Sequence, residues 1–143
     1  MRTANQPMKP LVLFICLGNS CRSIMAEALA RHCFGDAIAA ASAGLNPLGF
    51  IALETIVVLV EAGVDTTGLR SKGLEEITLE HCRLLVNLSD YSLASRIPPP
   101  LRDRVLHRPV LDPYGCDLKA YRQARDTIKG LITGELAGLL LPS

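Results

Sequence analysis

The stretch LVLFICLGNSCRS, Leu11–Ser23, decides how this chain is organised. It opens with five continuously apolar residues and lacks the alternation of a strand that is exposed on one face. Such a run predicts a short strand buried on both faces, as in a parallel sheet covered by helices. Residues at helical spacing, Met25, Ala28 and Leu29, follow directly. We therefore expect a strand, a tight loop over Cys16–Ser23 and a helix, in that order.

The rest of the chain alternates in the same way. Strands are predicted over 37–43, 83–88 and 105–110, and helices over 50–62, directly after Ser89, and from an N-cap at Asp117. Ser71 is expected to cap a short helical turn over 72–77. The alternation predicts an α/β fold: a single three-layer domain over 1–143, with a four-stranded parallel sheet and helices on both faces. Residues 1–10 hold two prolines and no apolar period, so a loose arm is expected there.

Composition and charge argue against several classes of function. A formal net charge of +1 gives no reason to expect a nucleic acid or an acidic membrane surface as partner. The three histidines are scattered, and no cysteine–histidine cluster has zinc spacing, so no metal is expected. Five cysteines, an odd number at low density, favour a reducing compartment. No segment reaches the ~18 apolar residues of a membrane span, and the run 11–17 is short for a signal peptide, so we expect a cytoplasmic protein.

The loop carries residue types that suit an oxyanion and a reactive sulfur. Ligands of open parallel sheets bind beyond the carboxyl ends of the strands, where Cys16 is predicted to lie. The N-terminus of the following helix favours an anion and a thiolate. Gly18 allows a close backbone approach, and Asn19 tolerates a left-handed conformation. Arg22 can donate two hydrogen bonds to two oxygens, and Ser23 can donate to the thiolate or cap the helix. An oxyanion site is favoured over a purely structural turn.

The motifs also resemble a known family. Cys16–Ser23 followed by Met25-Ala26-Glu27-Ala28 resembles the low-molecular-weight protein tyrosine phosphatases and their relatives, the thioredoxin-coupled arsenate reductases. Ser42-Ala43-Gly44 resembles the segment after the family's second strand, and Gly63-Val64-Asp65 the turn after its second helix. Asp112-Pro113-Tyr114 resembles the acid loop of the phosphatases. The likeness covers nearly the whole chain.

The resemblance implies roles for individual residues. Cys16 would attack phosphorus and form a phosphocysteine, Arg22 would bind the phosphate, and Asp112 would be the general acid and base. Asn19 and Ser42 would brace the loop, and Tyr114 would form a wall of the cleft. The binding residues implied in this way are Leu17, Gly18, Asn19, Ser20, Cys21, Ser23, Ser42 and Tyr114. No metal or cofactor is implied, and the substrate would be a phosphotyrosine-bearing protein or a small aryl phosphate.

Other features of the sequence resemble the arsenate reductases. Ser20 in the middle of the loop, Ile24 after it, Gly68, and Ser71-Lys72 are closer to their pattern. Reduction in that family needs two further cysteines about seven positions apart, which relay a disulfide away from the nucleophile to thioredoxin.

The cysteines of this chain do not have that spacing. Ser89 stands near the position expected for the first relay cysteine, and no cysteine follows it until Cys116. The spacing of Cys82 and Cys116 does not match the seven positions of the reductases. We therefore predict a phosphatase, with an arsenate reductase that uses thioredoxin as the alternative. A non-catalytic phosphate-binding module is the third hypothesis. Cys21 could form a protective disulfide with Cys16 or could be a small buried residue, while Asp112 could be only a turn former before proline.

Overall fold

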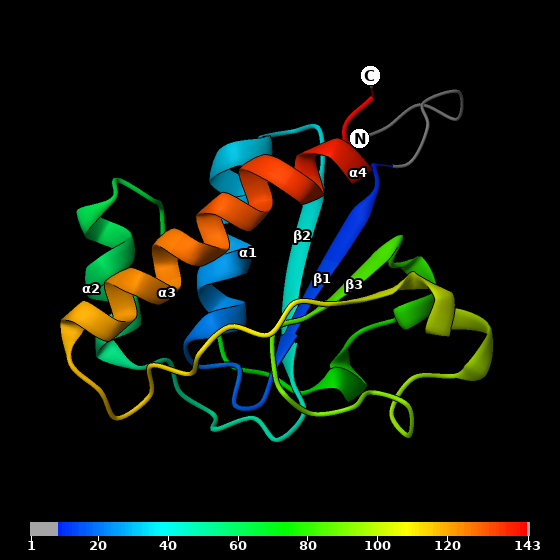
Figure 1. The fold of residues 1–143 in the computed structure, drawn as a ribbon, viewed down its shortest axis with the longest axis horizontal. Coiled ribbons are helices and arrows are strands. Elements are labelled where there is room, and N and C mark those ends of the chain that lie inside the picture. The colour runs from blue at the N-terminus through cyan, green and yellow to red at the C-terminus, as the bar shows by residue number, and fades with distance from the viewer. Residues whose placement is uncertain (1–8, 143) are drawn as a thin grey trace.

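A computed structural model describes residues 9–142 of the chain. Its strands are β1 (Leu11–Cys16), β2 (Ala39–Gly44), β3 (Leu84–Asn87) and β4 (Val105–His107). They form one sheet in the order β2-β1-β3-β4, and every pair is parallel. The helices are α1 (Arg22–Phe34), α2 (Leu53–Glu61), α3 (Leu118–Leu131) and α4 (Ala137–Leu140), with a π-helical turn, η4 (Ile132–Leu136), joining the last two (Figure 1). The predicted α/β fold with a four-stranded parallel sheet is confirmed.

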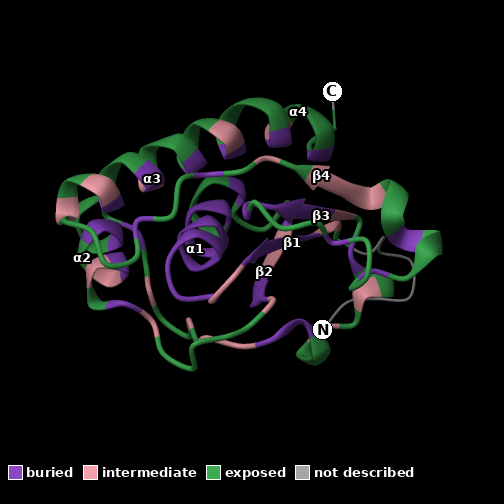
Figure 2. Cartoon of the chain, turned by 60° about the horizontal axis from the view of Figure 1, so that its bottom comes forward, coloured by how far each residue is buried: buried purple, intermediate pink, exposed green. Residues whose placement is uncertain are grey.

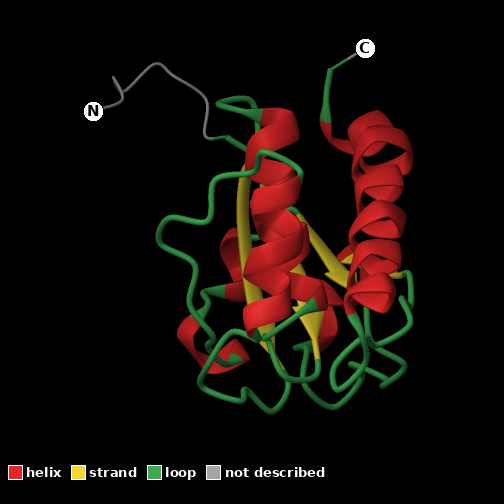
Figure 3. Cartoon of the chain, turned by 90° about the vertical axis from the view of Figure 1, so that its left-hand side faces the viewer, coloured by secondary structure: helices red, strands yellow, loops and turns green. Residues whose placement is uncertain are grey.

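The sheet separates two apolar clusters, which explains the unbroken apolar run of β1. Val12 and Phe14 belong to the cluster shared with α1, α2 and α3. Leu13 and Ile15 belong to the opposite cluster. That second face is covered by short 3-10 helices, η1 (Leu74–Glu76), η2 (Leu79–His81) and η3 (Pro99–Arg104), and by residues 88–98, so the third layer is thinner than the first (Figure 3).

Helix α1 lies between the sheet and the outer helices, as the buried colouring in Figure 2 shows. Ten of its 13 residues are buried, among them Arg22, Ser23 and Glu27. A helix packed on several sides can hold polar side chains in its interior only if they find partners there. The three buried polar residues of α1 all face the loop or its surroundings.

Some local predictions need correction. No helix follows Ser89, because the Asn87 side-chain oxygen accepts hydrogen bonds from the Ser89 N–H and hydroxyl groups and starts a turn instead. Ser71 does not cap a turn, since its hydroxyl contacts the Gly18 carbonyl and the Gly49 N–H. The cap at Asp117 is confirmed, because its carboxylate accepts from the Ala120 N–H at 3.1 Å.

Two further predictions concern the N-terminal arm and membrane-spanning segments. The loose arm predicted over 1–10 falls mostly on residues outside the described range. Within 9–142, the helices are all too short or too polar to span a bilayer.

Parallel pairing brings the carboxyl ends of all four strands to one edge, the lower edge in Figure 1. The segments that leave this edge are 17–21, 45–52, 88–98 and 108–117. Cys16 is the last residue of β1, so the nucleophile proposed from the sequence lies where these loops meet.

Candidate active site

The Cys16 sulfur lies at the first turn of α1. The residue is 2% exposed, and its Sγ is 2.9 Å from the Ser23 Oγ. The Asn19 Nδ2 donates to the same Ser23 oxygen at 2.7 Å. Because an amide nitrogen can only donate, the Ser23 hydroxyl accepts from Asn19 and keeps its own proton for Cys16. The Ser23 hydroxyl is thus a hydrogen-bond donor directed at the Cys16 sulfur.

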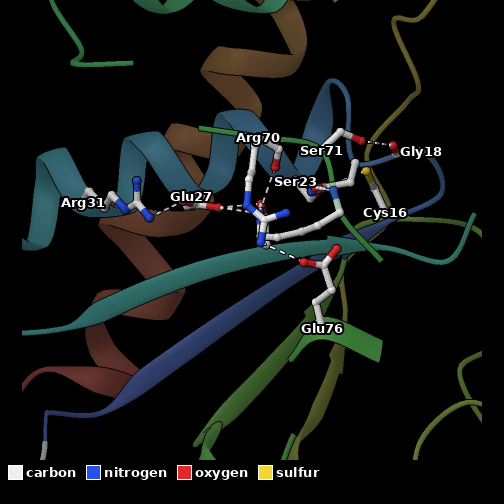
Figure 4. A network of polar contacts seen from close by, with 11 residues as sticks. Cys16, Gly18, Ser23, Glu27, Arg31, Arg70, Ser71 and Glu76 are labelled. Atoms are coloured by element: carbon white, nitrogen blue, oxygen red, sulfur yellow. Dashed lines mark hydrogen bonds and ion pairs between the residues drawn. The ribbon is translucent and has the colours of Figure 1, made fainter. Parts of the chain in front are cut away.

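The conformation of the loop depends on Asn19. It has φ of 46°, the only positive value for a non-glycine residue in 9–142. Its side-chain Oδ1 accepts from the Lys72 backbone N–H at 2.8 Å, which fixes the amide with Nδ2 toward Ser23. The Ser71 hydroxyl holds the neighbouring Gly18 carbonyl at 3.3 Å (Figure 4). Gly44 packs against the same loop so closely that a Cβ there would lie 3.0 Å from the Asn19 backbone nitrogen.

The Arg22 guanidinium is held along one edge and open along the other. Its Nη1 donates to the carbonyl oxygens of Leu88 and Val110, both at 3.1 Å. Its Nε is buried and has no hydrogen-bond partner within the described residues, and its Nη2 is 3.4 Å from the Asp112 Oδ2. The Nε and Nη2 groups are the pair that can bind two oxygens of one anion. The side chain is only 6% exposed, so it is held in this orientation before any ligand binds.

The acid loop completes the pocket. The Asp112 Oδ1 accepts from the Tyr114 N–H at 3.1 Å, which leaves Oδ2 toward Arg22. Both side chains are about half exposed, at 46% for Asp112 and 49% for Tyr114. The cavity measures about 120 Å³ and is lined by Cys16, Leu17, Gly18, Ser20, Cys21, Arg22, Asn46, Leu48, Asp112 and Tyr114. The three residues predicted to carry the chemistry therefore face one small pocket.

Residues 11–139 match the family model described as low molecular weight phosphotyrosine protein phosphatase. The chain belongs to this family. An arsenate reductase of Bacillus cereus is 32% identical over 123 residues, covering 85% of this chain and 90% of that protein.

Solved structures of this phosphatase family have the same fold. A low molecular weight protein tyrosine phosphatase from T. tengcongensis superposes with a TM-score of 0.80 at 30% identity, covering 91% of this chain and 99% of the other. The YwlE arginine phosphatase from Geobacillus stearothermophilus gives a TM-score of 0.81 at 25% identity, covering 91% of this chain and 92% of the other. Phosphatases and an arsenate reductase are thus similar to this chain at comparable levels.

Two of the residues expected from the family likeness hydrogen-bond within the loop, and one contacts a residue outside it. Asn19 and Ser23 support the loop from below the pocket. The Ser42 hydroxyl donates to the Glu27 Oε1 at 2.6 Å and makes no hydrogen bond to the loop among residues 9–142. The Lys72 N–H donates to Asn19 instead, so any support from Ser42 reaches the loop through Glu27 and Lys72.

Four residues in or behind the pocket were not predicted as site residues from the sequence. Asn46 and Leu48 enter the pocket from the turn after β2, and the composition of that turn gave no chemical signal. The spacing of Glu27 and Arg31 predicts an ion pair away from the apolar stripe of the helix, and Glu27 also stands in the motif that resembles the family, but neither observation predicts that it is buried, at 2% exposed. Lys72 belongs to the predicted turn over 72–77 and to a dipeptide that resembles the reductases, and neither pattern predicts its contact with Asn19.

The cysteines differ in their surroundings. Cys21 lines the pocket, and its thiol donates to the Tyr121 hydroxyl at 3.6 Å. Burial raises the pKa of Cys21, and the contact with Tyr121 opposes this. Cys82 precedes β3, at the opposite end of the sheet from Cys16, and burial raises its pKa to about 11. Cys116 is exposed on the acid loop. Residues 9–142 contain no group of three His, Cys, Asp or Glu side chains suited to a metal.

Proposed function

We propose that this family member is a phosphomonoester hydrolase, a protein tyrosine phosphatase that acts through a phosphocysteine on Cys16. The observation that carries the proposal is the guanidinium of Arg22. Its Nη1 is anchored by Leu88 and Val110, which leaves Nε and Nη2 available for an anion in the pocket that Arg22 and Cys16 both line. A guanidinium held in place beside a nucleophile can donate two hydrogen bonds to the oxygens of a transferring phosphoryl group and so stabilise the transition state.

The first step transfers the phosphoryl group to sulfur. The Cys16 thiolate forms an S–P bond while the P–O bond to the leaving group breaks, and protonated Asp112 delivers its proton to the leaving oxygen. Loop N–H groups and Arg22 bind the three non-bridging oxygens. In the second step ionised Asp112 takes a proton from water, whose oxygen forms a P–O bond as the S–P bond breaks. Phosphate leaves, and the Cys16 thiolate is restored.

The walls of the pocket suit an aromatic leaving group. Leu48 and Tyr114 line it and are 43% and 49% exposed, so they flank the entrance with apolar surface. Phe50 and Leu53, which are 51% and 72% exposed, line a neighbouring hollow that shares Tyr114 with this pocket. A phosphorylated side chain that reaches Cys16 would place its ring between Leu48 and Tyr114.

An arsenate reductase is the second candidate, because curated relatives carry that name. Such a reaction needs a second thiol to displace the nucleophile as a disulfide. Leu84 of β3 pairs with Val12, which sets Cys82 about six residues from Cys16 along the strand direction. At ~3.3 Å per residue this is roughly 20 Å, whereas bonded cysteines have Cα atoms less than ~7 Å apart. Cys21, which shares the pocket, is the better-placed thiol.

The deciding experiment compares substrates on one preparation. Purified protein should hydrolyse p-nitrophenyl phosphate in EDTA, Cys16→Ser should abolish turnover, and Cys82→Ser should have no effect. Phosphotyrosine and phosphoarginine peptides should be assayed beside it, since one structural neighbour is an arginine phosphatase. Arsenate reduction with thioredoxin, lost in Cys21→Ser, would support the reductase instead. Phosphate binding without any turnover would support the binding module.

A further inference from the structure

A buried charged cluster lies behind the nucleophile loop (Figure 4). Its centre is Glu27 in α1, whose side chain is 3% exposed. The Oε1 accepts from the Ser42 hydroxyl of β2 at 2.6 Å, and the Oε2 is paired with the Arg31 guanidinium. The Lys72 Nζ is 3.6 Å from Oε1. A buried carboxylate is tolerated only with such partners, so Glu27 depends on all three.

The ammonium group of Lys72 is enclosed in turn. Its side chain is 12% exposed, and its Nζ donates to the Arg70 carbonyl at 2.9 Å and lies 3.5 Å from the Ser42 hydroxyl. Burial lowers the pKa of Lys72, while the charge of Glu27 opposes this. The Arg70 guanidinium points elsewhere, to Glu76 at the surface (Figure 4). The Lys72 side chain is therefore anchored to α1 by the Glu27 charge.

The backbone of the same lysine supports the loop. The Lys72 N–H donates to the Asn19 Oδ1 at 2.8 Å, and the Lys72 carbonyl accepts from the Gly44 N–H at 2.9 Å. From Asn19 the contacts continue through the Ser23 hydroxyl to the Cys16 sulfur. One residue thus joins a buried ion pair to the hydrogen bonds that orient the nucleophile.

We propose that Glu27 and Lys72 are positioning residues whose ion pair holds the backbone at residue 72, and through Asn19 and Ser23 orients the Cys16 thiolate for an incoming phosphoryl group. The kinetic consequence rests on the proposed function. The geometric consequence is independent of it, because alkylation of Cys16 and protection by inorganic phosphate report the loop without turnover.

Glu27→Gln is the decisive variant, because it separates positioning from simple charge effects. Removing a negative charge near a thiol should, through space, make the thiolate easier to form. Loss of positioning has the opposite sign, since the Ser23 hydrogen bond to the thiolate weakens. We expect the pH midpoint of Cys16 alkylation by iodoacetamide to rise by about one unit, the equivalent of one hydrogen bond to a charged group. Protection by phosphate should weaken about tenfold through misalignment of the loop.

Lys72 variants give a second, independent measurement. Lys72→Met should change the alkylation midpoint and the phosphate protection in the same direction as Glu27→Gln. Lys72→Arg keeps the charge and should stay close to the wild type in both measurements. Arg70→Ala is the matched control, because its side chain is 63% exposed and only its backbone carbonyl belongs to the cluster. It should leave alkylation and phosphate protection as in the wild type.

The outcomes discriminate clearly. An unchanged or lower alkylation midpoint in Glu27→Gln, with circular dichroism showing a folded protein, overturns the proposal. If Lys72→Met does not fold, the comparison of Glu27→Gln with Lys72→Arg still decides the question. Wild-type alkylation and phosphate protection without aryl phosphate hydrolysis would refute the proposed function and leave this inference standing.

Discussion

Replacing Arg22 by lysine should separate the two tasks of its guanidinium. In the wild type Nη1 donates to the Leu88 and Val110 carbonyls, while Nε has no partner among residues 9–142 and Nη2 is 3.4 Å from the Asp112 Oδ2. One ammonium group can serve the carbonyls or the phosphate, but not both. Losing a forked pair of charge-assisted hydrogen bonds while keeping the charge removes on the order of 3 kcal/mol of transition-state stabilisation, or about 10²-fold in kcat/KM.

The same substitution should also lower stability. The Leu88 carbonyl keeps a second donor, the Val110 N–H at 3.0 Å, so the main loss is at the Val110 carbonyl. A buried acceptor that loses its donor costs about 1–3 kcal/mol in the free energy of unfolding. Lysine can avoid this cost only by leaving the phosphate site, which would reduce activity further.

The assays are p-nitrophenyl phosphate hydrolysis for kcat/KM and urea unfolding for stability. Arg108→Lys is the control, because that arginine pairs with Glu135 at the surface between β4 and η4. It should change neither quantity measurably. A loss of activity smaller than about fivefold in Arg22→Lys, or ~1 kcal/mol, would refute the assignment of Nε and Nη2 to the phosphate.

Three further outcomes follow from the structure. Asp112→Ala should slow aryl phosphate hydrolysis by about 10²–10⁴, as loss of a general acid does, and an unchanged rate would remove Asp112 from the mechanism. Gly44→Ala should destabilise the protein by about 1–3 kcal/mol and weaken phosphate protection, because its Cβ would lie 3.0 Å from the Asn19 nitrogen. Gly130→Ala, whose Cβ meets nothing within 4 Å in α3, is the control and should stabilise slightly. Cys82 should resist iodoacetamide at pH 8 and react only as the pH approaches its pKa of about 11; rapid labelling detected by mass spectrometry would contradict its burial.

The loop was predictable because its chemistry is local. Cys16 and Arg22 lie within one short segment, and the apolar run before it and the helical spacing after it fix where that segment lies in an α/β fold. Asp112 required the family likeness, since composition alone also allows a turn former before proline. The structure adds the 3.4 Å contact to Arg22, which composition does not encode.

The supporting contacts were not predictable from periodicity. Glu27 and Arg31 have the spacing of an exposed ion pair, but α1 is packed against the sheet and two helices, so this position is buried. Lys72 meets Asn19 across 53 positions of sequence, through its backbone, which leaves no residue-type signal. The prediction of a helix after Ser89 was wrong for a similar reason, because the hydrogen bond from the Ser89 N–H to the Asn87 side chain outweighed helical propensity.

The two hydrogen bonds from Arg22 to Leu88 and Val110, in the segments that follow β3 and β4, affect how inactive relatives should be recognised. A descendant that had abandoned catalysis would still lose stability without this arginine, because the Val110 carbonyl would be left without its donor. Cys16 has no comparable structural duty beyond one contact to Ser23, so serine or alanine could replace it at little cost. An intact arginine is therefore a marker of ancestry, whereas the cysteine is the marker of retained activity.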